Sequence, residues 1–570
     1  MTTSDTSDGT RPDRSPHTLS ADEGENGDGE RHHAFWADEV ADAIEARDPE
    51  EPIVIKGGVS PSGIPHLGHA NEILRAYFVA QVLRERGYEV RQVFTSDDRD
   101  PLRKLPRQLA DTDWTIVGLG EVDAGALGRN LGKPYSAIPD PFGDCHDSYG
   151  AHFTDLLQSS TERLCVPVEM VSTTDLYTAG RLDDEVREVL EHVDRARELL
   201  APFQAKVDDS YVPFNPICSA CGMLSESVTA VDPESGTVEY VCADREVGDR
   251  TIEGCGHEGT AGFREGKLPW RFEWPAQWRT LGVDFEPFGK DHAEGSWPSG
   301  EAIATGLFGI DPPVPMVYEW FTLNGEALSS SSGNVVTVEE LLALLEPEVV
   351  RYFFALDPKR ARDLDLSTLD QLVDDFDRFE RIALGRETAD ESLVAFTERA
   401  YPFVIEGTPT AEISPDDRIR LPYTFAAVLG MVEDPELREQ LARDQGHVPA
   451  DASDAAIEAA LARVERARAW AERMDNAYNY RVQAELPDVS FDSGTEAALD
   501  DLAAFVEENH DGDAIQGAIY ETAREHDIEV GEFFEAGYRL FFDDTQGPRL
   551  GEFLGELERE FVVDRLRRDR

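Results

Sequence analysis

Between residues 53 and 95 the chain carries two apolar runs separated by a loop and an amphipathic stretch. The runs at 53–55 and 88–95 predict strands. One face of the helix predicted between them carries the apolar residues Ile73, Leu74, Tyr77, Phe78, Val82 and Leu83. Gly87 is expected to end this helix. The order predicts a βα unit of an open parallel sheet, in which ligands bind beyond the carboxyl ends of the strands.

From about residue 337 onward the pattern predicts helices. Thr337 is expected to cap the first of them. The periodic runs predict helices at 338–345, which is the helix after Thr337, and at 366–384, 424–431, 455–480, 495–508 and 550–567. The chain shows no heptad regularity and no internal repeat. An all-helical module after a nucleotide-binding domain favours substrate recognition over chemistry.

The loop at 57–69 joins the first predicted strand to the helix. Its glycines let the backbone approach a ligand, Pro61 and Pro65 stiffen it, and the helix start offers unpaired N–H groups to phosphate. His66 and His69 then supply neutral or cationic donors to a triphosphate. A lone H-x-x-H is more often a pair of surface histidines, but the strand, loop and helix around it favour a nucleotide site.

The charge of the chain is strongly negative. Its 570 residues include 115 acidic and 53 basic side chains, giving a formal net charge of -62 and a pI near 4.4. Only seven residues are lysine, and none follows Lys359. Such self-repulsion loosens a compact fold unless molar salt shortens the Debye length to about 3 Å. We therefore expect a cytoplasmic protein of a halophile rather than a merely acidic mesophilic protein.

The segment 1–34 is polar and acidic, which predicts a disordered tail and not a signal peptide. No stretch approaches the ~20 apolar residues that a membrane span needs. We expect no membrane contact.

Four of the six cysteines predict a zinc site. They are Cys218, Cys221, Cys242 and Cys255. The first pair is a C-x-x-C knuckle, and the second pair follows a strand-rich segment at 227–241. Because the second pair is spaced by twelve residues, His257 is an alternative to Cys255. The competing interpretation is a set of ordinary buried thiols, and Cys165 is expected to be such a core residue in a strand.

A second candidate metal cluster lies within thirteen residues and contains Asp140, Cys145, His146 and His152. Cysteine, histidine and carboxylate form a legitimate zinc set. Asp144 is an alternative carboxylate, because the sequence cannot choose between the two aspartates. The competing interpretation is an exposed loop and helix start.

Two signatures resemble those of class I aminoacyl-tRNA synthetases. His66-Leu67-Gly68-His69 resembles the "HIGH" element, and the segment 328–334 resembles the mobile "KMSKS" loop. The second is altered, since Ala327 and Ser330 stand where lysines are usual and Ser332 is also neutral. Stabilisation of pyrophosphate would then depend on hydroxyls, backbone donors, magnesium, and Lys290 or Arg103.

Taken together, the chain resembles the class I lysyl-tRNA synthetases of halophilic archaeal type, from about residue 35 to the C-terminus. The sequence motifs that carry the resemblance lie at 58–69, 96–104, 140–152, 287–292, 318–321, 351–354 and 376–381. The cysteine module carries it as well. The resemblance implies an α/β fold, with a Rossmann-like parallel nucleotide-binding domain, a zinc-containing insertion and an all-α C-terminal domain. The expected boundaries are 35–210 and 264–336 for the catalytic domain, 211–263 for the insertion and 337–570 for the anticodon-binding domain.

The resemblance also implies the reaction. Lysine carboxylate attacks the α-phosphate of ATP, and a terminal ribose hydroxyl of tRNA(Lys) then attacks the lysyl-adenylate. The implied cofactors are ATP, Mg²⁺ and Zn²⁺ at one or two sites. The implied partners are tRNA(Lys) and L-lysine, with no DNA. Catalysis would rest on positioning and charge stabilisation, because little acid-base chemistry is needed.

Site residues are carried over by position in these motifs. Catalytic roles fall to His66, His69, Ser329 and Ser331. ATP-binding roles fall to Pro61, Gly63, His66, Gly68, His69, Gly289, Lys290, Asp291, Ser329, Ser330 and Ser331. Lysine-binding roles fall to Gly58, Ser60, Asp97, Asp98, Trp270, His292 and Tyr318. The two aspartates could instead be surface charges, and Trp270 could be a core residue.

Recognition of tRNA poses a separate problem, because a gain from counterion release collapses as salt rises. We expect shape, stacking and base contacts to dominate, with Arg378, Arg381, Arg463 and Arg481 as candidate contacts. Two rival functions remain. One is a class I synthetase for glutamate, glutamine, arginine or cysteine, and the other is a catalytically silent tRNA-binding paralogue, which the loop without lysines favours.

Overall fold

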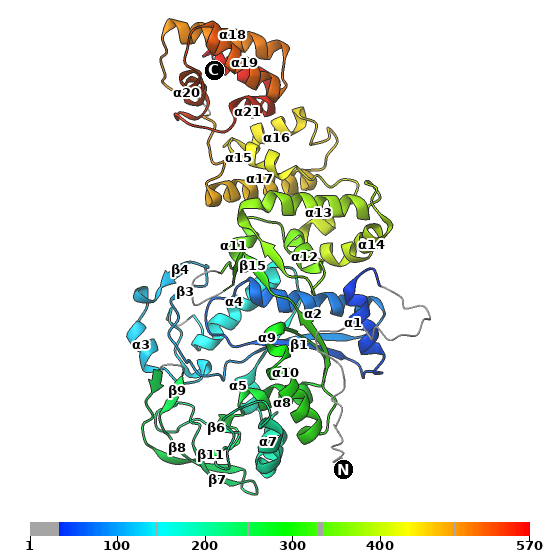
Figure 1. Ribbon diagram of the computed structural model, residues 1–570, viewed down its shortest axis with the longest axis vertical. Helices are drawn as coiled ribbons and strands as arrows, with labels where there is room; N and C mark the ends of the chain where they lie inside the picture. The colour runs from blue at the N-terminus through cyan, green and yellow to red at the C-terminus, as the bar shows by residue number, and fades with distance from the viewer. Residues whose placement is uncertain (1–32, 144, 248–249, 329–334, 484, 570) are drawn as a thin grey trace, which may run out of the picture. The chain divides into compact units, whose positions relative to one another are not determined.

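The computed structural model describes residues 33–143, 145–247, 250–328, 335–483 and 485–569. The chain divides into two compact units. The first comprises residues up to 339 with 354–364, and the second comprises 340–353 with 365–570. Figure 1 shows the strands in the first unit and only helices along the second. The expected tail at 1–34 lies almost entirely outside the described residues.

A five-stranded parallel sheet forms the centre of the first unit, in the order β14, β13, β1, β2, β5. The strands are β1 (Ile53–Val59), β2 (Val90–Ser96), β5 (Glu169–Ser172), β13 (Val283–Gly289) and β14 (Val314–Tyr318). The register pairs Val59 with Ser96 and Gly289 with Tyr318. The strand ends that precede the candidate site residues therefore meet at one edge of the sheet, which confirms the predicted βα unit.

Helices connect and cover these strands. They are α1 (Trp36–Glu45), α2 (Leu67–Glu85), α3 (Ala124–Arg129), α4 (Tyr149–Arg163), α5 (Thr173–Thr178), α6 (Asp183–Glu191), α7 (Val193–Leu200), α8 (Trp270–Leu281), α9 (Lys290–Ala293) and α10 (Ser296–Ile303). Helix α2 packs on β1, β2 and β13 with its buried face. It ends at Glu85 with Arg86 as its C-cap, and Gly87 follows with φ of 99°, as the sequence predicts.

Small antiparallel sheets form the segment between α7 and α8. This segment lies within the connection from β5 to β13. The strands there are β6 (Asn215–Pro216), β7 (Val228–Asp232), β8 (Thr237–Val241), β9 (Arg245–Val247), β10 (Arg250–Ile252), β11 (Glu258–Gly262) and β12 (Gly266–Lys267). β8 lies between β11 and β7, so the predicted strand-rich segment at 227–241 is confirmed. Outside this segment lie β3 (Gln108–Ala110), β4 (Ile116–Gly118), β15 (Phe321–Leu323), β16 (Glu326–Ala327) and β17 (Arg362–Leu364).

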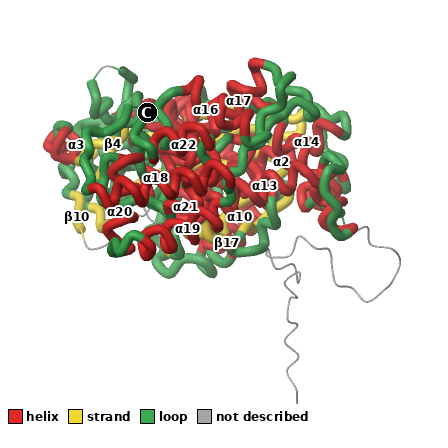
Figure 2. The backbone as a smooth tube through the Cα atoms, turned by 90° about the horizontal axis from the view of Figure 1, so that it is seen from above, coloured by secondary structure: helices red, strands yellow, loops and turns green. Residues whose placement is uncertain are grey.

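Every regular secondary-structure element among the described residues of the second unit is a helix. Its helices are α13 (Leu369–Ala383), α14 (Glu391–Ile405), α15 (Tyr423–Gly430), α16 (Pro435–Asp444), α17 (Asp454–Met474), α18 (Ser493–Glu508), α19 (Gly512–Glu525), α20 (Val530–Phe542), α21 (Leu550–Glu556) and α22 (Arg559–Leu566). The short helices α11 (Val338–Leu342) and α12 (Pro347–Ala355) contain residues of both units. Figure 2 shows α18 beside α22 and α19 beside α21, which pack against each other.

Three sequence expectations differ from the structure. The helix predicted over 550–567 is two helices, because Leu557 adopts an extended backbone between α21 and α22. The helix predicted over 455–480 ends at Met474, where Asp475 turns into the left-handed region. Cys165 is not a strand residue, since it lies half-buried between α4 and β5 with φ of 57°. Among the described residues, no helix is both long enough and apolar enough to span a bilayer.

Candidate active site

The two histidines of the H-L-G-H element hold each other at the start of α2. His66 is the N-cap residue, and its Nδ1 accepts a hydrogen bond from the Gly68 amide over 3.1 Å. The His66 amide in turn donates to His69 Nδ1 over 3.2 Å. The two imidazoles stack with their centroids 4.0 Å apart. This reciprocal cap satisfies helix amides that would otherwise be free and fixes both rings.

These contacts also fix where the proton of each ring lies. A backbone amide can only donate, so Nδ1 of His66 and of His69 must be acceptors and each neutral ring carries its proton on Nε2. Burial lowers the pKa of His66 to about 4. Burial, with the neighbouring His66, holds the pKa of His69 well below its usual value. The pair therefore presents two neutral Nε2–H donors near neutral pH.

Glycines near the loop make room for neighbouring side chains. A Cβ on Gly58 would lie 2.1 Å from Thr95 Oγ1, and one on Gly68 would lie 2.8 Å from the His66 ring. Gly63 meets nothing within 4 Å. The sequence H-L-G-H thus needs its glycine so that the His66 ring can fold over the first turn.

Glu72 is a carboxylate that the sequence analysis did not single out. Its Oε1 accepts from the Gly58 amide over 2.8 Å, and the Tyr318 hydroxyl donates to its Oε2 over 3.1 Å. Burial, together with the nearby carboxylate of Glu286, raises the pKa of Glu72 to about 7. The residue lies three positions after His69, so α2 carries it to the same edge of the sheet.

A buried acidic group follows β2. Lys267 forms ion pairs with Asp100 and with Glu273, the latter over 2.6 Å. In the described part of the chain Asp97 forms no direct ion pair, and it accepts a hydrogen bond from Gln277 over 3.2 Å. Burial, together with the neighbouring carboxyls of Glu273 and Asp100, raises the pKa of Asp97 to about 7. Three carboxyls share one ammonium here, so the group is suited to receive a second cation.

Asp98 is placed differently from Asp97. Its carboxylate accepts hydrogen bonds from the Ser172 and Thr173 hydroxyls, over 2.6 and 3.2 Å, and from the Thr174 amide over 2.8 Å. These donors surround the start of α5. Asp98 therefore has a structural role in ordering this turn.

Aromatic rings line α8 beside the acidic group. Trp270 stacks on Trp274 with centroids 5.1 Å apart, and His292 lies 5.6 Å from Trp274 and 6.4 Å from Trp270. The indole of Trp274 donates to Glu286, which also pairs with Lys56 over 2.8 Å inside the core. Trp270 is half-buried and belongs to this aromatic group.

The turn after β13 carries Gly289 to His292. Lys290 forms an ion pair with Glu319 and lies 4.6 Å from the ring centroid of Trp320, which is 53% exposed. The carboxylate of Asp291 lies 3.7 Å from His292. Lys290 is therefore held at the surface of the site by partners that a phosphate would have to displace.

Two clusters bring candidate metal ligands together, one of four cysteines and one of an aspartate and two histidines. The sulfurs of Cys218, Cys221, Cys242 and Cys255 all lie within 4.8 Å of one another. His257 is not in this group, because its Nε2 lies 3.1 Å from the Ser219 hydroxyl. The arrangement favours Cys255 over His257 as the fourth ligand.

The second cluster is formed by Asp140, His146 and His152. His152 Nε2 lies 2.8 Å from the Ala110 carbonyl, which can only accept, so its Nδ1 is left with a lone pair. Among the described residues that buried Nδ1 has no hydrogen-bond partner, and it faces Asp140 Oδ2 at 3.4 Å. Two acceptors that face each other require a cation or a further proton between them. Cys145 is exposed and lies outside the group, and Asp144 lies outside the described residues.

The family model described as "tRNA synthetases class I (K)" matches residues 34–401. The chain belongs to this family.

Relatives extend the similarity beyond the matched region. A protein of Haloarcula marismortui named lysine–tRNA ligase is 65% identical over 94% of this chain and 97% of its own length. A protein of the same name from Pyrococcus horikoshii is 32% identical over 93% of this chain and 99% of its own. Among solved structures, a glutamate tRNA ligase from Elizabethkingia meningosepticum covers 91% of this chain and 99% of that chain. Its 11% identity and TM-score of 0.37 are too low to support an argument.

The structure brings most of the expected site residues of this synthetase to the carboxyl edge of the sheet. Gly58 lies near the end of β1 and Ser60 follows it, and Asp97 follows β2. His292 comes three residues after β13, and Tyr318 ends β14. The expected residues Ser329, Ser330 and Ser331 lie outside the described residues. The segment that follows them does reach α2, because the Leu67 amide donates to the Val336 carbonyl over 3.0 Å.

The four arginines expected to contact tRNA are all paired with carboxylates. Arg463 is buried and bound to Glu346 and Asp377, so the expectation that it contacts tRNA is wrong. The other three are half-exposed and pair with Glu387, Glu433 or Glu472: Arg378, Arg381 and Arg481. Sequence alone gave no sign of these pairs, because the partners lie up to 117 positions away.

Proposed function

We propose that the chain is a lysine–tRNA ligase of the class I type. It activates L-lysine with ATP and transfers the lysyl group to tRNA(Lys). The observation that carries the proposal is 65% identity, over nearly the full length of both chains, to a relative named lysine–tRNA ligase. A lysine carboxylate oxygen bonds to the α-phosphorus as the bond to pyrophosphate breaks, and a ribose hydroxyl of tRNA then displaces AMP.

The triphosphate is the ligand of the H-L-G-H element in this proposal. His66 and His69 donate from Nε2 to phosphate oxygens, with Gly68 making room for the ring of His66. Pro61 and Gly63 shape the loop, and Gly289, Lys290 and Asp291 meet the nucleotide from β13. Ser329, Ser330 and Ser331 complete the set, with catalytic roles for the first and third. Magnesium accompanies ATP and shields its charge.

The lysine site is the region between Glu72, Asp97 and the aromatic rings of α8. Asp97 is buried and Glu72 is half-buried, both have a pKa raised to about 7, and neither forms an ion pair among the described residues. An incoming ammonium would stabilise their ionised forms. Trp270 offers a ring face to the same ammonium. Gly58, Ser60, His292 and Tyr318 surround the rest of the substrate, and Asp98 acts by ordering the turn beside them.

Two zinc sites are also proposed. Cys218, Cys221, Cys242 and Cys255 fit a structural zinc ion, because four thiolates converge in the small sheets at 211–263. Asp140, His146 and His152 fit a second, with Cys145 as the remaining ligand once the loop closes on the metal. A bound cation would remove the conflict between the two acceptors of His152 and Asp140.

The functional division of the chain follows from these assignments. Residues 35–210 and 264–336 form the catalytic domain, and 211–263 form the zinc insertion. Residues 337–570 form the domain that binds the anticodon end of tRNA. The chain acts in the cytoplasm, where its substrates are present.

The test is aminoacylation in concentrated KCl, with ATP, magnesium, homologous tRNA and each of the twenty amino acids in turn. Charging with lysine alone is the expected result. Charging with another amino acid would reassign the enzyme. Binding of tRNA without charging would favour the silent paralogue.

A further inference from the structure

The backbone around Lys267 is held on both sides. Lys267 is the last residue of β12, which pairs with β6. The carbonyl of Gly266, one position before it, accepts a hydrogen bond from the buried guanidinium of Arg99 over 2.9 Å. The amide of Leu268, one position after it, donates to the Tyr177 hydroxyl over 2.8 Å. The Lys267 side chain therefore enters the core from a fixed point.

The ammonium of Lys267 is bound between two carboxylates. It forms ion pairs with Asp100 and, over 2.6 Å, with Glu273. The Tyr177 hydroxyl donates to the other oxygen of Glu273 over 2.8 Å. The Ser60 hydroxyl donates to the other oxygen of Asp100 over 2.7 Å. Each of these two carboxylates thus has a partner on both oxygens, which leaves neither free for a ligand.

Asp97 is the third carboxyl of this acidic group, and its situation is different. It is 3% exposed, and it forms no ion pair within the described part of the chain. Its Oδ1 accepts a hydrogen bond from the side-chain amide of Gln277 over 3.2 Å. Lys56 lies close by but is bound to Glu286 over 2.8 Å. Asp97 is therefore a buried acid to which none of the described cations is bound directly.

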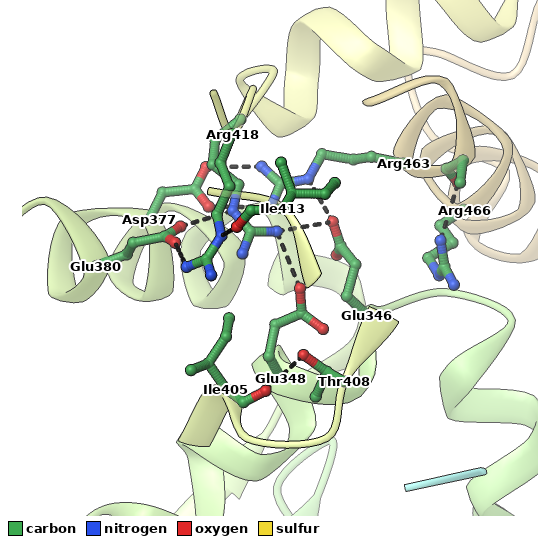
Figure 3. A network of polar contacts seen from close by, with 12 residues as sticks. Glu346, Glu348, Asp377, Glu380, Ile405, Thr408, Ile413, Arg418, Arg463 and Arg466 are labelled. Carbon is green, nitrogen blue, oxygen red and sulfur yellow. Dashed lines mark hydrogen bonds and ion pairs between the residues drawn. The ribbon is translucent and has the colours of Figure 1, made fainter. Parts of the chain in front are cut away.

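A buried charge network in the second unit gives the contrast (Figure 3). Arg463 binds Glu346 over 2.5 Å and Asp377 over 2.7 Å. Arg420 binds Glu380 over 2.6 Å and Glu348 over 3.0 Å. Each of these four carboxylates contacts a guanidinium, which is how buried charges are tolerated. Asp97 has no such contact among the described residues, so the acidic group has a place for one more cation.

We propose that Lys267 is a positioning residue: it occupies Asp100 and Glu273, so that the ammonium of the substrate is left with Asp97. The proposal rests on lysine being the substrate, as the proposed function states. Without Lys267, two carboxylates would attract the substrate ammonium more strongly than Asp97 alone. The substrate would then shift, and its carboxylate would leave the position from which it attacks ATP. A second link runs from Lys267 through Asp100 to Ser60, which is proposed to contact the same substrate.

The test uses the full-length protein in concentrated KCl, with tRNA present. Lys267→Ala opens the position of the ammonium, and n-propylammonium has the chain length that this substitution removes. Propylammonium chloride replaces part of the KCl at constant ionic strength, and 1-propanol is its neutral control. The readout is kcat/KM in ATP–pyrophosphate exchange for lysine and for homolysine, which is longer by one methylene. Lys206→Ala, at an exposed position, is the control variant, and thermal unfolding checks that both variants fold.

We expect kcat/KM for lysine to fall by up to about 100-fold in Lys267→Ala, the scale of a 1 Å misplacement. The preference for lysine over homolysine should shrink by roughly tenfold, the lower end of what one methylene is worth, because the longer chain reaches the opened position. A loss of structure alone would lower both substrates equally. Propylammonium should restore most of the activity with lysine, and 1-propanol should not. Lys206→Ala should keep the wild-type values.

A second variant covers the case in which Lys267→Ala does not fold. Lys267→Ala combined with Glu273→Gln keeps the formal charge of the acidic group at its wild-type value, and the same shift toward homolysine is expected. If a folded variant keeps the wild-type preference and propylammonium restores nothing, Lys267 only supports the fold and the proposal is overturned. A wild type that fails to activate lysine would refute the proposed function itself, so the two failures are distinguishable.

Discussion

The amide of Leu67 donates a hydrogen bond to the carbonyl of Val336 over 3.0 Å. Leu67 is the first residue of α2, directly after His66, and Val336 follows the serine-rich segment. Positions 269 apart in the chain are thereby tied at the start of the helix that carries both histidines. The second residue after the altered loop signature is thus tied to the start of the helix that carries the first signature, where phosphate is favoured.

Gly68→Ala tests whether the fold of the His66 ring over α2 serves catalysis. The new Cβ would lie 2.8 Å from the ring and push it away from its cap position. We expect the rate of lysine-dependent ATP–pyrophosphate exchange, measured with tRNA present, to fall by up to about 100-fold, the scale of a 1 Å misplacement. Thermal stability should change little, because alanine favours a helix over glycine by about 1 kcal/mol, and this gain offsets the displacement of the His66 ring.

Gly128→Ala, in α3 and outside the assigned site residues, is the matched control. A Cβ there meets nothing within 4 Å, so exchange should stay near the wild-type rate. Equal losses in the two variants would show that the effect does not come from the packing of His66.

Glu72→Gln tests the carboxylate that links Gly58 and Tyr318. Glutamine can keep the acceptor for the Gly58 amide but carries no charge for a substrate ammonium. Loss of a charged hydrogen bond of about 1.5–3 kcal/mol should raise KM for lysine by roughly 10- to 100-fold. KM for ATP should not change. Glu85→Gln, at an exposed position of the same helix, is the control, and an unchanged KM for lysine in Glu72→Gln would contradict the assignment.

The same carboxyls predict a pH dependence. Glu72 and Asp97 have pKa values raised to about 7, so each is largely protonated at pH 6 and cannot pair with an ammonium. We expect kcat/KM for lysine to rise with pH through about 7 in the wild type. The rise should be smaller in Glu72→Gln and absent when Asp97→Asn is added. A profile that is flat in the wild type between pH 6 and 8 would rule this out.

Linkage gives the sign of the corresponding stability effect. A carboxyl whose pKa is higher in the folded state than in the unfolded state stabilises the fold at low pH. Its contribution is lost as pH rises from about 4.5 to about 7. Chemical denaturation without substrates should therefore show a smaller decline over this range for Glu72→Gln than for the wild type.

Removal of one zinc ligand should unfold the small sheets around it. The sulfurs of Cys221 and Cys242 lie 3.7 Å apart, and a zinc ion on the four sulfurs would link the small sheets to each other. Cys221→Ser should lose one equivalent of zinc by elemental analysis and several kcal/mol of local stability. Cys165→Ser, outside both clusters, should keep the full metal content. Equal zinc in the two variants would refute the four-cysteine site.

Potassium chloride should stabilise the protein up to molar concentration. With a formal net charge of -62, unscreened repulsion favours expansion, and salt suppresses it. The unfolding midpoint should therefore rise steadily with KCl, while affinity for tRNA(Lys) should fall only slightly. The paired arginines Arg378, Arg381 and Arg481 support the second expectation, since each already has a carboxylate partner. A steep loss of affinity across the molar range would contradict it.

The sequence by itself determined the local features of this protein. Periodicity located α2, α13, α15, α17 and α18 but missed α4, α8, α14, α19 and α20, and the glycine-rich loop with His66 and His69 indicated a nucleotide site. Cysteine spacing indicated the four-sulfur group. These features are readable because each is encoded within a short stretch, where propensity, capping and ligand spacing act between near neighbours.

Only the tertiary structure decided which of these residues act together. It brought Glu72 to Gly58 and Tyr318. It gave Asp98 a hydrogen bond from the start of α5 that Asp97 does not share. It also buried Arg463 beside carboxylates that are distant in the sequence. It also set the pKa values of the histidines and carboxyls. Burial and the charge of neighbours determine these properties, and both depend on contacts between distant segments that no local pattern records.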